Sequence, residues 1–215
     1  MSFRRWVAPL TLLLGAACSD GIAPSAPPAV QPHLLRWAGS SAPRFDAIGA
    51  VTRHQGYAVA PVIDAYQASF WAVRGEARSI QLDYQQQDTS RSAPFLVFTA
   101  TDPTYVPGLG DLAPGDSVLI TVEVDSANVA VRFEPSGLQF GTPATLTIWY
   151  DGVDGDLNAD GVVDSTDAYI ESQLLGLWYR EDETSPWSPM AYAKSLTEKW
   201  FTTSIPHFTE FAVAW

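Results

Sequence analysis

The chain has 215 residues, 47% of them hydrophobic, which is enough for one sizeable domain with a small appendage. Its 24 acidic and 12 basic residues give a net charge of −12. The sequence has no basic stripe for phosphates and no polybasic patch for lipid headgroups, so nucleic-acid binding and electrostatic membrane binding are both disfavoured.

The first 17 residues have the pattern of a secretory signal peptide. Arg4 and Arg5 precede a short apolar run, Val7 to Leu14, and small residues then lead to Cys18. This pattern resembles a bacterial lipoprotein signal, although Gly15 stands where that pattern prefers leucine. We therefore expect cleavage before Cys18, a lipid anchor on this cysteine and a location at the cell envelope. Cleavage of the same bond without lipidation would instead give a secreted protein with a free thiol.

Residues 18–44 are predicted to form a proline-rich tether. Four prolines and many small residues fill its first half, a composition typical of an extended segment that holds a domain away from a membrane. The part from His33 to Arg44 contains three large apolar residues. It is either a first edge strand or more linker, and the role of residues 33–66 is left open.

From residue 45 to residue 215 the sequence indicates β structure. Apolar runs recur every 10 to 20 residues, Gly- and Pro-rich turns separate them, and no long helical period is present. The main runs are 68–73, 80–84, 95–100, 118–124, 129–135, 138–143, 144–150, 175–179, 199–203 and 208–215. The first two, joined by a turn at Arg74 to Glu76, are predicted to form a hairpin. This spacing predicts an all-β fold, an antiparallel β-sandwich.

One connection between strands is strongly acidic. Ten of the 24 acidic residues lie between Asp151 and Glu183, opposed there only by Arg180. Within it, oxygen-bearing side chains stand at positions 1, 3, 5, 9 and 12 and glycine at position 6, which is the spacing of an EF-hand calcium loop. Position 7 of such a loop supplies a backbone carbonyl. The candidate calcium ligands are Asp156, Asn158, Asp160, Val162, Asp164 and Asp167.

This acidic loop is expected to bind Ca²⁺, because carboxylates at such density repel one another unless a cation is present. With aspartate at position 12, the loop resembles the calcium loops of cellulosomal dockerins. A strand enters the loop where an EF-hand has a helix, and the sequence contains no second copy. We expect an insertion over residues 151–170 that ends in a short helix, capped by Asp164 or Ser165. The alternative is an acidic connection without metal.

Four stretches toward the C-terminus form a further pattern. They are Asp116–Ser117 before a β run, Phe133 to Pro143 with the spacing F-x-P-x-G-x-x-F-x-x-P, Leu177–Tyr179 followed by Trp187, and Ile205 to Thr209. Together they resemble ZU5-like domains, over about residues 117–215. The resemblance implies a β-sandwich adaptor for protein–protein contact, with no cofactor and no enzymatic activity. The partner would then be an envelope or extracellular protein.

In some relatives of that family, the last of these stretches cuts its own backbone. The resemblance would give Thr209 the role of nucleophile and His207 the role of base. Threonine replaces the family's serine here, and cleavage would release only residues 209–215. We therefore expect an intact chain, and self-cleavage stays an alternative.

Eight tryptophans and eight tyrosines also permit a carbohydrate-binding module, because flat aromatic rings stack on sugars. The strand positions of four tryptophans instead predict that they fill the core. These four are Trp149, Trp178, Trp200 and Trp215. Trp187, which lies close to two prolines, is expected to be the exposed one.

Overall fold

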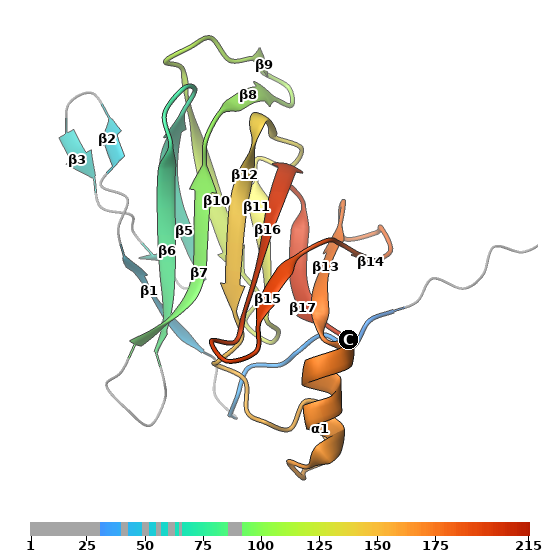
Figure 1. The fold of residues 1–215 in the computed structure, drawn as a ribbon. Coiled ribbons are helices and arrows are strands. Elements are labelled where there is room, and N and C mark those ends of the chain that lie inside the picture. Colours follow the sequence, from blue (N-terminus) through green and yellow to red (C-terminus); the bar gives the residue numbers. More distant parts are fainter. Residues whose placement is uncertain are drawn as a thin grey trace, which may run out of the picture.

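The computed structural model describes residues 31–39, 43–48, 52–54, 57–59, 63–64, 66–85 and 92–215. The predicted signal peptide and Cys18 lie outside them. The described strands form two antiparallel sheets packed face to face, and a separate ribbon of β2 (Thr52–His54) and β3 (Tyr57–Val59) (Figure 1). The predicted all-β sandwich is confirmed. In this part of the chain, no helix is long and apolar enough to cross a bilayer.

The first sheet has the order β1-β6-β7-β12-β16-β15, and β8 and β9 extend it beside β12. Its strands are β1 (Arg44–Ile48), β6 (Arg78–Gln85), β7 (Ser92–Ala100), β8 (Pro103–Val106), β9 (Gly110–Asp111), β12 (Gln139–Trp149), β15 (Ala193–Ser195) and β16 (Trp200–His207). The predicted runs 138–143 and 144–150 are one strand, β12. Its register against β16 shifts between Gln139 and Ala144, and Pro143 lies in this irregular stretch, where a missing N–H is tolerated.

The second sheet has the order β14-β13-β17-β11-β10-β5-β4. Its strands are β4 (Ile63–Asp64), β5 (Gln67–Val73), β10 (Ser117–Val124), β11 (Ala130–Glu134), β13 (Gly176–Arg180), β14 (Ser188–Pro189) and β17 (Glu210–Ala214). Alternation in β10 sets its orientation, because Val118, Ile120 and Val122 are buried in the core while Leu119 and Thr121 lie on the outer face.

The predicted hairpin of residues 68–84 is wrong, although its turn and both strands exist. β5 belongs to the second sheet and β6 to the first, so the turn at Arg74 carries the chain from one layer to the other. β5 pairs along its whole length with β10, and β6 pairs with β7. Because the two strands lie in opposite layers, Phe70 and Ile80 both reach the core between the sheets.

Phenylalanine fills the centre of the sandwich. The ring of Phe98 lies next to those of Phe70, Phe133, Phe140 and Phe208, with centroid distances between 4.8 and 6.3 Å. These rings come from both sheets and bury a large apolar surface without any disulfide.

The tryptophan assignment is reversed. The four tryptophans at 149, 178, 200 and 215 are only half-buried. At three of these sites the adjacent residue, Ile148, Leu177 or Phe201, is the one that points into the core, because successive side chains of a strand alternate between its faces. Trp187 is 8% exposed and packs on the outer face of the second sheet, over the small side chains of Ala130 and Ala212. The Trp187 ring and the two alanines form a small second core on this outer face. The prolines near Trp187 in the sequence gave no sign of it.

Residues 31–39, which the sequence assigned to the tether, pack against the sandwich as a strap. His33 and Trp215 exchange two backbone hydrogen bonds of 2.8 and 3.1 Å, and their rings stack at 4.9 Å. Leu35 donates its N–H to Val213 and is 1% exposed. The strap therefore behaves as an extra strand beside the C-terminal end of β17.

Candidate functional site

The acidic loop connects β12 to the helical segment at one end of the sandwich, close to the strap and the C-terminus (Figure 1). The helical segment consists of α1 (Ser165–Tyr169) and the π-helical turn η1 (Ile170–Leu174). The predicted short helix and its cap at Asp164 are confirmed. The Asp164 side chain accepts the N–H of Thr166. It also accepts the backbone N–H of Asp167, whose carboxylate in turn accepts the N–H of Asp164, and this reciprocal pair forms a capping box.

Side-chain oxygens hold the rest of the loop by accepting backbone N–H groups. Asp156 accepts from Asp160 at 3.1 Å and from Gly161 at 2.7 Å, while Asp160 accepts from Val162 at 2.9 Å. Asn158 accepts from Asp160 at 3.0 Å and donates its amide to the Asp160 carboxylate at 2.9 Å. Gly161 has φ of 89°, a left-handed conformation that suits glycine, so the turn predicted at position 6 is present.

Asp167 joins the two ends of the loop. It is 3% exposed and accepts the N–H groups of Leu157 at 2.7 Å, Asn158 at 3.4 Å and Asp164 at 2.9 Å. The hydrogen bond from Asp164 is the main reason that the pKa of Asp167 is lowered, and those from Leu157 and Asn158 act in the same direction. The carboxylate of Asp167, at position 12 of the loop, is thus ionised and held in place by backbone N–H groups.

The donor set has the chemistry that calcium prefers. Carboxylate, amide and carbonyl oxygens are hard ligands, and an oxygen that accepts one N–H keeps a second lone pair for a cation. Among the residues that the structure describes, no group of three or more His, Cys, Asp or Glu side chains is arranged to hold a metal ion. Position 7, Val162, is 58% exposed at the surface of the loop. The donors therefore fit Ca²⁺ by type, while their carboxylates do not converge in this conformation.

The loop is attached to both ends of the described domain. Trp215 donates its indole N–H to the carbonyl of Leu157, and Ala38 of the strap donates its N–H to Gly152. A cavity of about 330 Å³ lies between strap and loop, and Arg36, Trp37, Asp154 and Asp156 are among its lining residues. A change in the conformation of the loop would therefore reach the strap and the C-terminus directly.

His207 and Thr209 lie near the junction of β16 and β17 but do not bond to each other. The Thr209 hydroxyl is buried without a hydrogen-bond partner, and His207 Nδ1 lies 3.8 Å from the carboxylate of Glu181. The carbonyl of Phe208, which a self-cleaving nucleophile would attack, accepts the N–H of Gly137 at 3.2 Å.

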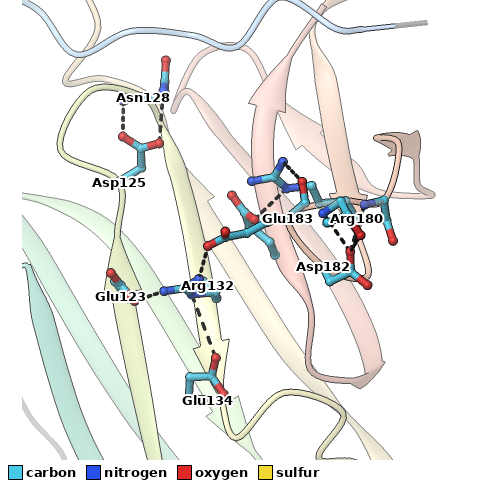
Figure 2. Close-up of polar contacts among 11 residues, drawn as sticks. Glu123, Asp125, Asn128, Arg132, Glu134, Arg180, Asp182 and Glu183 are labelled. Atoms are coloured by element: carbon cyan, nitrogen blue, oxygen red, sulfur yellow. Dashed lines mark hydrogen bonds and ion pairs between the residues drawn. The ribbon is translucent and has the colours of Figure 1, made fainter. Parts of the chain in front are cut away.

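A charged groove on the outer face of the second sheet was not predicted from the sequence. Figure 2 shows Arg132 on β11, with Glu123 bonded to it at 2.6 Å and Glu183 at 2.7 Å. Arg180 pairs with Glu210 at 2.7 Å and lies 4.8 Å from the centre of the Trp187 ring. The two arginines and the three glutamates line a groove of about 360 Å³. Alternation places Glu123, Arg132 and Glu210 on the outer face, but only the pairing of β10, β11, β17 and β13 brings them close to Arg180. Glu183 lies in the connection that follows β13.

No protein-family model, curated protein or solved structure matches this chain.

Proposed function

We propose that this chain is a non-enzymatic interaction module of the cell envelope, lipid-anchored at Cys18 and ordered by Ca²⁺ in its acidic loop. The observation that supports this best is the position of the loop. It has the ligand types and spacing of a calcium loop, and it is bonded to the strap that leads toward Cys18.

Calcium would act here as a structural ion. The oxygens of Asp156, Asn158, Asp160 and Asp164, the carbonyl of Val162 and the remaining lone pair of Asp167 are the groups that would hold it. The ion would offset the mutual repulsion of the carboxylates. Because Gly152 and Leu157 accept hydrogen bonds from Ala38 and Trp215, an ordered loop would also hold the strap and Trp215 in place.

Thermal unfolding of the mature chain, compared in millimolar calcium and in EGTA, tests the calcium part of this proposal. We expect a higher melting temperature with calcium and a smaller or no increase with magnesium. Equal melting temperatures in calcium and EGTA would overturn it. Membrane fractionation tests the anchor separately.

A further inference from the structure

We propose, on the basis that the chain is an interaction module, that its partner-binding surface is the outer face of β10, β11 and β17. The partner would be a protein segment with a Lys or Arg side chain that enters the groove beside Arg132. The charge and shape of the groove, and one exposed apolar residue on the same face, support this assignment.

The charge of the groove is negative after its own ion pairs are counted. Four acidic residues line it, namely Glu123, Asp125, Glu183 and Glu210, against the two arginines Arg132 and Arg180. Arg132 is already bonded by two glutamates and Arg180 by a third. The glutamates of the groove thus neutralise both arginines, and the net negative charge that remains attracts a cation and repels an anion.

Glu183 makes the groove a pocket instead of a flat sheet surface. It lies in the connection from β13 to β14, which folds over the outer face as Trp187 packs on Ala130 and Ala212. The Glu183 side chain is 71% exposed, so it can turn from Arg132 toward an incoming cation. The groove of about 360 Å³ falls in the range of ligand pockets.

An exposed apolar residue on the same face determines how far apart the apolar and basic side chains of the partner should be. Leu119 is 44% exposed and lies on β10 opposite Trp71 of β5. Four residues of strand separate Leu119 from Glu123, a distance of roughly 13 Å. An extended segment with an apolar residue and a basic residue four positions later would contact both points, since alternate side chains of a strand face the same way.

The test uses two pentapeptides, Leu-Ser-Thr-Ser-Arg and Leu-Ser-Thr-Ser-Glu, titrated into the isotope-labelled mature chain and followed by NMR. We expect the arginine peptide to shift the amides around Leu119, Glu123, Arg132 and Glu183, and the glutamate peptide to leave them unchanged. In the double variant Glu123→Gln/Glu183→Gln, the affinity for the arginine peptide should fall by about tenfold.

A matched control loses the same charge elsewhere. Asp111→Asn/Glu198→Gln changes two exposed carboxylates, one on β9 and one just before β16, and should keep the affinity within about twofold, because salt screens charges that lie far from the groove. Glu183→Lys, at an exposed position, serves as the second variant if the double variant unfolds, and it should abolish binding.

Equal binding of both peptides, unchanged affinity in Glu183→Lys, shifts confined to residues 151–167, or no binding of either peptide would each overturn the assignment of this face. The calcium response is measured without any peptide, so failure of the groove and failure of the proposed function give different results.

Discussion

Trp37 of the strap donates its indole N–H to the backbone carbonyl of Asp125 over 2.8 Å. The same ring lies against Phe45, Tyr84 and Phe95, so one residue of the predicted tether closes the end of the sandwich. The folded part of the chain therefore includes residues well before the first strand of the sheets.

Trp37→Ala should lower the free energy of unfolding by about 3–5 kcal/mol, because a buried aromatic side chain leaves a cavity. Trp37→Phe keeps a ring but leaves the Asp125 carbonyl without its donor, and should cost about 1–2 kcal/mol. Urea unfolding of the two variants measures both values. A loss below about 1 kcal/mol for Trp37→Ala would mean that the strap is not part of the cooperative fold.

Local sequence rules predicted the features that depend on neighbouring residues. Strand alternation predicted most of the sheet residues, and a capping residue at Asp164 or Ser165 predicted where the short helix begins. Pairing between distant strands was not predictable in this way, because β5 and β10 are joined only by a long connection. The groove around Arg132 depends on that pairing and on the fold of the 181–187 connection.

The burial of Trp187 and the strap was missed for a related reason. Prolines beside Trp187, and those that precede the strap, favour irregular backbone, which the sequence rules treat as exposed. The small residues Ala130 and Ala212 leave room on the outer face of the sheet, and that space exists only in the assembled structure.

Asp167→Asn should weaken the fold most at neutral pH. The pKa of Asp167 is lowered in the folded state, so its carboxylate stabilises the fold above the ordinary pKa of 3.8. That contribution is lost as the pH falls through the lowered folded-state pKa. The difference in unfolding free energy between wild type and Asp167→Asn should therefore shrink on acidification below about pH 4. A difference that stays constant from pH 7 to pH 2.5 would contradict this role.

Calcium should stabilise the chain in proportion to its occupancy. At a concentration of 100 times the Kd, mass action adds about 2.7 kcal/mol to the free energy of unfolding. Asp156→Ala/Asp160→Ala should abolish the increment, while Asp111→Ala, at an exposed acidic residue of β9, should keep it. Calcium titration followed by calorimetry on these three proteins separates a specific site from general charge screening. An increment that survives in Asp156→Ala/Asp160→Ala would exclude the acidic loop as the site.

Cys18→Ser should move the protein from the membrane fraction to the soluble fraction. An acyl chain contributes about 0.8 kcal/mol for each buried methylene, so an anchor with two or more chains is effectively permanent. Fractionation and the mass of the N-terminal peptide measure location and lipidation together. Wild-type protein that is soluble and has an unmodified Cys18 thiol would contradict the anchor.

Thr209→Val should leave the chain intact and raise the free energy of unfolding by about 1 kcal/mol. The Thr209 side chain is 3% exposed and its hydroxyl has no hydrogen-bond partner, so the native fold carries the cost of an unpaired buried polar group. Valine keeps the shape and removes that cost, whereas Thr209→Ala leaves a small cavity and should destabilise. Chemical unfolding ranks the three proteins by their free energy of unfolding.

The intact mass of the wild type tests the self-cleaving alternative. A product ending at Phe208 that disappears in Thr209→Val would show that the unpaired hydroxyl is a nucleophile, and the chain would then be a self-processing domain.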